Sequence, residues 1–203
     1  MDNYIENKMN VFSENFTPLW VDMLEELDEL YNFPKNGNFL DIGCGYGILT
    51  NMFKQNYKYS ELIGISPEKD IIEFIDSYYN DISFFPYKIE ELTQYKEHFN
   101  FIFSRGSYRF WDNKLIGFKN VINSLKKDGI ALIGGGFGNN VQKSRIKQAR
   151  INIANALGKN NGKEGSVPYP TREELVLILK KAGIENFTFT PDDYTGLWIY
   201  IKK

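Results

Sequence analysis

Short apolar runs alternate with longer amphipathic segments along most of this chain. The runs end at Gly, Pro or Ser, and segments with helical spacing follow them, which is typical of strands that alternate with helices. The pattern predicts strands over residues 38–42, 61–65, 82–85, 99–104, 130–134, 186–190 and 197–201. It predicts helices over residues 16–31, 48–56, 68–79, 114–126, 141–157 and 172–182.

Local residue signals support several of these helix ends. Ser66-Pro67 has the form of an N-cap followed by proline at the first helical position. Thr171 and Glu174 have the spacing of a capping box. Asp128-Gly129 follows a predicted helix, and we expect it to end that helix with the glycine in left-handed geometry.

The order of the predicted elements favours an α/β fold. A run of strand–helix units predicts a parallel sheet with helices on both faces. The last two strands are separated only by a short turn around Pro191–Gly196, so we expect an antiparallel hairpin at one sheet edge. The length of 203 residues fits a single domain, residues 1–203, with a helical N-terminal cover over residues 1–36 and a basic insertion or lid over residues 139–170.

Composition narrows the class of protein. The net charge of −2 gives no general reason to expect a polyanionic partner. A single cysteine, Cys44, cannot form an internal disulfide or a Cys-rich metal cluster, and we predict no metal site. The polar N-terminus does not resemble a signal peptide, and no apolar run is long enough to span a membrane. We therefore expect a cytoplasmic protein without a membrane partner.

The strongest motif is a glycine-rich loop between a strand and a helix. Gly43, Gly45 and Gly47 follow an apolar strand at alternate positions, and an amphipathic helix begins at Ile48. Glycines at such a turn let a ligand approach the main chain, and the next helix presents free N–H groups. The dinucleotide fingerprint G-x-G-x-x-G requires a third glycine where Ile48 stands, so a nicotinamide enzyme is disfavoured.

The segment Asp41-Ile42-Gly43-Cys44-Gly45-Tyr46-Gly47 resembles motif I of the class I S-adenosylmethionine (SAM)-dependent methyltransferases, close to (D/E)-x-G-x-G-x-G. The resemblance implies a Rossmann-like, doubly wound seven-stranded sheet of order 3-2-1-4-5-7-6 with strand 7 antiparallel and helices on both faces. It implies SAM as cofactor and S-adenosylhomocysteine as product. In this family, Asp41 would face the methionine amino group, and Gly43, Cys44, Gly45 and Gly47 would line the cofactor.

The same resemblance extends to the next three strand ends, with departures. It assigns to the cofactor pocket Ser66 and Pro67, then Lys88, Ile89 and Glu90, and finally Ser104 and Arg105. Family members commonly have an aspartate for the ribose where this chain has none, so Ser66 or Glu68 would have to replace it. Lys88 occupies the position of an aspartate for the adenine amino group, and a lysine cannot accept that hydrogen bond. A backbone carbonyl or Glu90 would then substitute.

The acceptor site is expected beyond the fourth and fifth strands, because ligands of open α/β sheets lie at the carboxyl ends of the strands. Arg105, Tyr108 and Arg109 follow the fourth strand, and Gly134-Gly135-Gly136 follows the fifth. Arginine forks suit carboxylate or phosphate. We predict catalytic roles for Tyr108 and Arg105. The only histidine, His98, lies at the opposite end of the fourth strand, roughly 20 Å away.

The sequence therefore predicts a methyltransferase acting on a small molecule, with an anionic acceptor as one possibility. The missing carboxylates leave open a catalytically silent SAM-binding or regulatory partner. The basic insertion leaves open an RNA or protein methyltransferase, so a nucleic-acid partner is disfavoured but not excluded; its basic residues are Lys143, Arg145, Lys147, Arg150, Lys159 and Lys163. The oligomeric state stays open.

Overall fold

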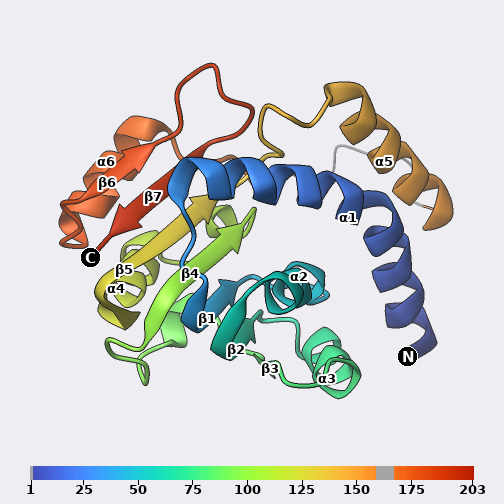
Figure 1. Ribbon diagram of the computed structural model, residues 1–203, viewed down its shortest axis with the longest axis horizontal. Coiled ribbons are helices and arrows are strands. Elements are labelled where there is room, and N and C mark those ends of the chain that lie inside the picture. The colour runs from blue at the N-terminus through green and yellow to red at the C-terminus, as the bar shows by residue number, and fades with distance from the viewer. Residues whose placement is uncertain (1, 159–166) are drawn as a thin grey trace.

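A seven-stranded sheet forms the centre of the protein (Figure 1). The computed structural model describes residues 2–158 and 167–203. The strands are β1 (Asn36–Ile42), β2 (Lys58–Ile65), β3 (Ser83–Phe85), β4 (Phe99–Arg105), β5 (Leu125–Gly134), β6 (Phe187–Phe189) and β7 (Trp198–Lys202). The helices are α1 (Asp2–Tyr31), α2 (Ile48–Asn56), α3 (Lys69–Tyr78), α4 (Lys114–Ser124), α5 (Lys143–Ala156) and α6 (Arg172–Lys181), with single 3₁₀ turns η1 (Ile89–Glu91) and η2 (Tyr108–Phe110).

The strand order is β3-β2-β1-β4-β5-β7-β6. β1 to β5 pair in parallel, whereas β7 runs antiparallel to both β5 and β6. The predicted order and the predicted terminal hairpin are confirmed. The five parallel strands all end at one edge of the sheet, so the loops that follow β1, β2, β3, β4 and β5 meet there.

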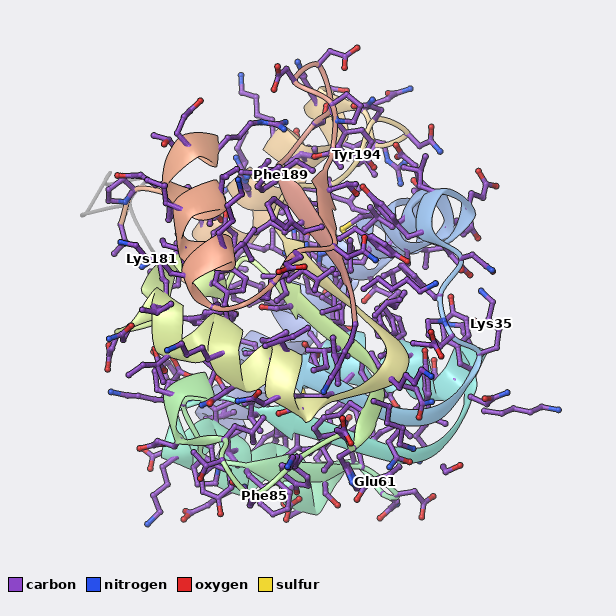
Figure 2. All side chains as sticks on the ribbon, turned by 90° about the vertical axis from the view of Figure 1, so that its left-hand side faces the viewer. Lys35, Glu61, Phe85, Lys181, Phe189 and Tyr194 are labelled. Carbon is purple, nitrogen blue, oxygen red and sulfur yellow. The ribbon has the colours of Figure 1, made fainter. Side chains whose placement is uncertain are left out.

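Alternation along the strands divides the core into two layers. On β1, Phe39 belongs to one buried cluster and Leu40 to the other, as expected when successive side chains point to opposite faces. Helices α1, α2, α3 and α5 contribute to the first cluster, and α4 and α6 to the second. Figure 2 shows the side chains filling the space between helices and sheet, with Lys35 and Lys181 among the exposed ones.

Helix α1 is longer than the sequence predicts. It begins at Asp2 rather than at residue 16 and contains Pro18, which lacks the N–H of an interior helical residue. Ile5 and Met9 are nevertheless buried, and Met9 belongs to the core cluster of the first layer. Packing of this otherwise polar segment on the body of the protein therefore stabilises a helix that its local sequence does not indicate. In Figure 1 the helix arches over one side of the sheet.

Two predicted helix ends have different outcomes. The capping box before α6 is confirmed, because Thr171 and Glu174 exchange hydrogen bonds of 3.2 and 2.8 Å. The expectation for Asp128-Gly129 is wrong. Helix α4 ends at Ser124, both residues lie within β5, and Asp128 rather than the glycine is left-handed at φ 65°. Pairing of β5 with β4 from Leu125 onward ends the helix earlier.

Helix α5 occupies part of the predicted basic insertion and lies beside α1. Ile146, Ala149 and Ile153 are buried, as the helical spacing predicted. Arg145 forms an ion pair of 2.5 Å with Asp22 of α1. Lys159 and Lys163 lie outside the described residues. Of the helices that the structure describes, none combines the length and the apolar character needed to cross a membrane.

Candidate functional site

The glycine-rich loop forms a tight turn from β1 into α2. The amides of Gly43 and Cys44 both donate to the carbonyl of Ile65 at the end of β2, at 2.7 and 3.1 Å. Gly43, Gly45 and Gly47 all have positive φ. A Cβ on Gly43 would lie 2.3 Å from the Cβ of Ser107, whereas a Cβ on Gly45 would meet no atom within 4 Å. Gly43 is therefore required by packing, and Gly45 faces open space.

That open space belongs to a cavity of about 450 Å³, which we call the loop cavity. Gly43, Gly45 and Tyr46 form one wall, and segments that follow β2, β3 and β4 form the others. The predicted residues that line it are Gly43, Gly45, Ser66, Pro67, Lys88, Ile89, Glu90 and Arg105. Other residues line the loop cavity and lie outside the predicted cofactor set: Ile42, Tyr46, Ile65, Ile71, Tyr87, Gly106, Ser107, Phe110, Trp111 and Asp112. Half of them, the five from Gly106 to Asp112, lie in the segment between β4 and α4, so the predicted end of the fourth strand could have signalled that group.

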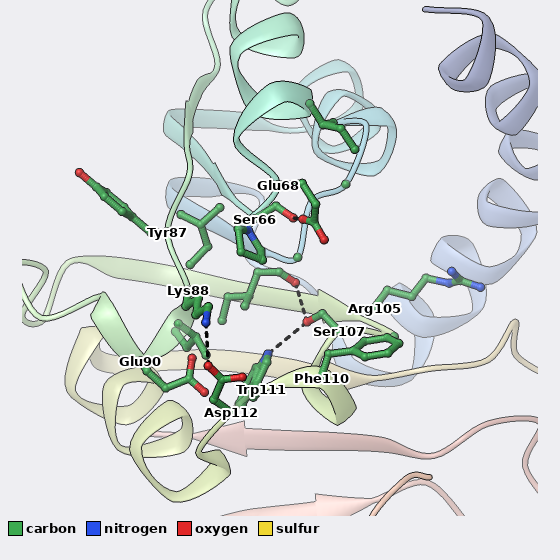
Figure 3. Close-up of a pocket in the computed structure, with 18 of the residues that line it drawn as sticks. Ser66, Glu68, Tyr87, Lys88, Glu90, Arg105, Ser107, Phe110, Trp111 and Asp112 are labelled. Carbon is green, nitrogen blue, oxygen red and sulfur yellow. Dashed lines mark hydrogen bonds and ion pairs between the residues drawn. The ribbon is translucent and has the colours of Figure 1, made fainter. Parts of the chain in front are cut away.

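A carboxylate, that of Glu68, follows β2, although the aspartate that family members commonly have there for the ribose is missing. Glu68 lines the loop cavity, and the hydroxyl of Ser66 donates a hydrogen bond to its carboxylate (Figure 3). Glu68 is also the N-cap residue of α3, without a side-chain capping bond. The prediction that Ser66 caps this helix is wrong, because its hydroxyl is directed to Glu68 instead. The two residues present a polar pair to the cavity.

Lys88 forms an ion pair with a residue from a different loop. Its ammonium donates to a carboxylate oxygen of Asp112 at 2.7 Å, and both residues line the loop cavity (Figure 3). The bond to Asp112 raises the pKa of Lys88. Glu90 accepts a hydrogen bond of 2.9 Å from the backbone amide of Asn113 at the start of α4. The β3 and β4 loops therefore place two carboxylates beside the lysine.

Four predicted cofactor residues do not line the cavity: Asp41, Cys44, Gly47 and Ser104. Asp41 is 2% exposed and accepts a hydrogen bond of 2.7 Å from the hydroxyl of Thr50 in α2. Burial raises the pKa of Asp41 to about 7. Asp41 follows Leu40 on β1, and strand alternation turns its side chain toward α2, away from the cavity that Ile42 lines.

The other three are held by the fold around the loop. Cys44 is buried, and burial raises the pKa of its thiol, as expected for a packing residue rather than a nucleophile. Gly47 is the N-cap of α2, in left-handed geometry. The hydroxyl of Ser104 donates to the carbonyl of Ile42 at 2.9 Å, which ties β4 to β1 under the loop.

A second cavity, of about 660 Å³, adjoins the first at Arg105 and Gly106, which line both. We call it the arginine cavity, because Arg105, Arg109 and Arg150 line it. The other lining residues are Phe16, Tyr108, Gly135, Gly136, Phe137, Tyr169, Gly196 and Leu197. The loops after β4 and β5 meet here as predicted, and α1, α5 and the β6–β7 turn complete the walls.

Arg105 is fixed at the boundary between the two cavities. Its Nε donates to the carbonyl of Gly136 at 3.2 Å, and its guanidinium lies 4.3 Å from the ring centre of Phe137. Burial lowers the pKa of Arg105 to about 10, so the side chain still carries a full charge at neutral pH. Such a positioned cation on the wall of both cavities can contact a ligand in either one.

Tyr108 is fully buried and lines the arginine cavity. Its hydroxyl has no hydrogen-bond partner in the described part of the chain. Burial raises the pKa of Tyr108 above its usual value, with a further contribution from Tyr169. The group therefore stays protonated at neutral pH and can donate or accept a hydrogen bond without acting as a base.

His98 lies far from both cavities, as predicted, and contacts Glu61 and Asn38 near the amino ends of the strands. Within residues 2–158 and 167–203, no group of three His, Cys, Asp or Glu side chains has the arrangement of a metal site.

Comparison with known proteins identifies one family. A family model described as "Methyltransferase domain" matches residues 17–188. No curated protein matches the sequence.

Solved structures share the fold at low sequence identity. A candidate S-adenosyl-L-methionine-dependent methyltransferase from Methanococcus maripaludis superposes with a TM-score of 0.77 at 22% identity, covering 100% of this chain and 93% of that one. A candidate sarcosine dimethylglycine methyltransferase from Galdieria sulphuraria gives a TM-score of 0.62 at 13% identity, covering 89% and 83%. A phosphoethanolamine N-methyltransferase from Haemonchus contortus, in complex with S-adenosyl-L-methionine, gives 0.69 at 13% identity, covering 100% and 57%.

Proposed function

This chain belongs to the methyltransferase domain family and is a class I SAM-dependent methyltransferase, and we propose that it transfers the methyl group to a small molecule held in the arginine cavity. The observation that carries the proposal is the shared wall at Arg105 and Gly106. One cavity lies against the glycine-rich loop and the other beside it, so a cofactor and an acceptor can occupy neighbouring sites.

The loop cavity fits SAM in its chemistry. The open position at Gly45 leaves room against the main chain for the methionine part. The carboxylate of Glu68 can accept hydrogen bonds from ribose hydroxyls, in place of the absent aspartate. Ile65, Ile89 and Trp111 offer apolar surface for an adenine ring. Asp112 or Glu90 can accept from an exocyclic amino group, which Lys88 cannot do.

The protein mainly has to position the reactants, since bound SAM supplies a methyl group already activated by its sulfonium. Alignment of reacting groups can contribute several kcal/mol, up to about 7–11 in the best cases. We assign to Arg105, at the boundary of the two cavities, and to Tyr108, in the arginine cavity, the holding and orienting of the acceptor. The raised pKa of Tyr108 argues against its use as a proton acceptor.

A small acceptor is favoured over RNA by the surroundings of the basic helix. Arg145 of α5 is paired with Asp22, and Arg150, although exposed, lines the arginine cavity. Two of the similar structures above are of proteins whose names contain small amines, sarcosine and phosphoethanolamine. These names support a small-molecule acceptor for this chain.

The test combines binding and transfer. Purified protein is titrated with S-adenosylhomocysteine by calorimetry, then incubated with methyl-labelled SAM and separate small-molecule, RNA and protein fractions of a cell extract. Label in the small-molecule fraction supports the proposal. Label in RNA or protein would show that the acceptor class is wrong. Binding without transfer to any fraction would favour the silent SAM-binding partner.

A variant links transfer to the arginine cavity. Tyr108→Phe removes a buried hydroxyl that has no partner in the described chain, so the fold and the binding of S-adenosylhomocysteine should be retained. Transfer should fall by about tenfold if the hydroxyl orients the acceptor, a typical value for one hydrogen bond. Unchanged transfer would exclude Tyr108 from the acceptor site.

A further inference from the structure

The arginines of this chain fall into two groups. There are five, and the described residues include all of them. Arg145 pairs with Asp22, and Arg172 pairs with Asp192. The remaining three, Arg105, Arg109 and Arg150, all line the arginine cavity and form no ion pair with any carboxylate that the structure describes.

The cavity concentrates positive charge without compensation. Among the described residues that line it, there is no aspartate or glutamate. Arg150 lies close enough to contribute to the lowered pKa of Arg105, so the guanidinium charges oppose one another. Partly buried charges of one sign are costly unless an opposite charge joins them. A bound anion would supply that charge.

Hydrogen-bond donors in the cavity also lack partners. The Nε of Arg109 and the hydroxyl of Tyr108 are buried, and neither has a hydrogen-bond acceptor among the described residues. A buried polar group without a partner is uncommon and destabilising, which indicates that a ligand or water supplies the partner. The acceptor atoms missing here are those that a carboxylate or phosphate carries.

Aromatic rings hold two of the guanidiniums in place. The guanidinium of Arg109 lies 4.5 Å from the ring centre of Phe110 and 4.9 Å from that of Tyr169. That of Arg105 lies against Phe137 and, at 5.4 Å, Trp20. Stacked guanidiniums lose less freedom when a ligand binds, because their planes are already oriented.

From these contacts we infer that the methyl acceptor carries an oxyanion group, a carboxylate or a phosphate, which Arg109 and Arg150 bind while Arg105 holds it beside the loop cavity. The inference rests on the proposed function, since it takes the arginine cavity as the acceptor site. The shared requirement is a planar or tetrahedral group of oxygens that accepts several N–H bonds. The acceptor class is thereby narrowed from any small molecule to small acids and phosphate esters.

The experiment measures anion binding directly. Sodium phosphate and sodium acetate are titrated into the protein at constant ionic strength, with chloride as the compensating salt, and binding is followed by calorimetry with and without saturating S-adenosylhomocysteine. We expect saturable binding of phosphate or acetate, and the tighter of the two identifies the group. Saturation by neither anion would overturn the inference.

Three matched variants locate the binding. Arg109→Gln and Arg150→Gln should each weaken anion binding by about tenfold or more. Arg145→Gln removes the same charge from the same helix as Arg150, outside the cavity, and should leave anion binding unchanged. Arg150 is exposed, so its variant remains informative even if Arg109→Gln destabilises the protein. Equal anion affinity in Arg150→Gln and Arg145→Gln would overturn the inference.

The proposed function has a separate readout in the same titrations. S-adenosylhomocysteine should bind all three variants with the affinity of the wild type, because Arg109, Arg145 and Arg150 do not line the loop cavity. If the protein binds the anion but not S-adenosylhomocysteine, the proposed function is wrong and the oxyanion site is retained. If it binds S-adenosylhomocysteine but not the anion, the oxyanion site is wrong and the proposed function is retained.

Discussion

Replacing Gly45 by alanine should separate cofactor binding from folding. Gly45 has φ of 54°, and an added Cβ would meet no protein atom within 4 Å. Left-handed geometry costs an L-residue about 1–2 kcal/mol. For a chain of this size that cost lowers the thermal midpoint by about 2–8 °C. The new methyl group would instead occupy the loop cavity, where Gly45 is part of the wall.

The expected loss of affinity for S-adenosylhomocysteine follows from the same geometry. Forcing an extra methyl group into an occupied site typically costs about 1–3 kcal/mol, which corresponds to about a 5- to 150-fold loss of affinity. Calorimetric titration with S-adenosylhomocysteine measures this loss, and thermal unfolding measures the effect on stability.

Gly183 provides the matched control. It has φ of 80° just after α6, an added Cβ there also meets nothing within 4 Å, and it lines neither cavity. Gly183→Ala should therefore lose similar stability and no affinity. The reasoning is refuted if Gly45→Ala binds as tightly as Gly183→Ala, or if it loses far more stability, since Gly45 would then be needed for the fold.

Three further predictions follow from the loop cavity and its support. Glu68→Gln should weaken S-adenosylhomocysteine binding by about tenfold or more, because a charged acceptor for ribose hydroxyls is lost, whereas Glu73→Gln on the same helix should not; calorimetry compares the two. Asp112→Asn should also weaken binding while the thermal midpoint changes little, because its ion pair with Lys88 is exposed and screened. Asp41→Asn should raise the free energy of unfolding relative to the wild type by an amount that grows from pH 4 to pH 7 and is constant above pH 7. Chemical denaturation at several pH values measures this difference.

The sign of the Asp41 effect follows from proton linkage. Burial raises the pKa of Asp41 from 3.8 to about 7, so between these values the folded protein holds a proton that the unfolded chain releases. Stability of the wild type therefore falls as pH rises through this range, by up to roughly 4 kcal/mol. Asparagine lacks this titration. A stability difference between variant and wild type that is the same at pH 5 and pH 8 would contradict the burial argument, and equal binding by Glu68→Gln and Glu73→Gln would contradict the role given to Glu68.

The position of the glycine-rich loop could be predicted from the sequence because its signals are local. An apolar strand, three glycines at alternate positions and an amphipathic helix occupy one continuous stretch of chain. Short apolar runs that end at Gly, Pro or Ser likewise predicted all seven strands, since strands buried on both faces of a sheet are apolar along their length. Helix α1 was underpredicted before Phe16, because the burial that stabilises that segment comes from distant residues.

The residues of the loop cavity were only partly predictable. The motif resemblance placed Asp41, Cys44, Gly47 and Ser104 at the cofactor, but the pleat of β1 and the packing under the loop turn them away from the cavity. Asp112 was not predicted, because its carboxylate reaches Lys88 from 24 residues further along the chain. Sequence spacing carries no information on such a contact.

The fold class, the strand order expected from the family resemblance, and the loop proposed for the cofactor site could all be inferred from the sequence alone, because each depends on local periodicity or a continuous motif. The tertiary structure decided which side chains face the two cavities. Arg105 ends β4 and Arg109 follows it, whereas Arg150 lies on α5, and only the packing of α5 beside α1 and the sheet edge brings the three together. Parallel strands deliver their loops to one edge, and the contacts among those loops are set by packing between distant segments.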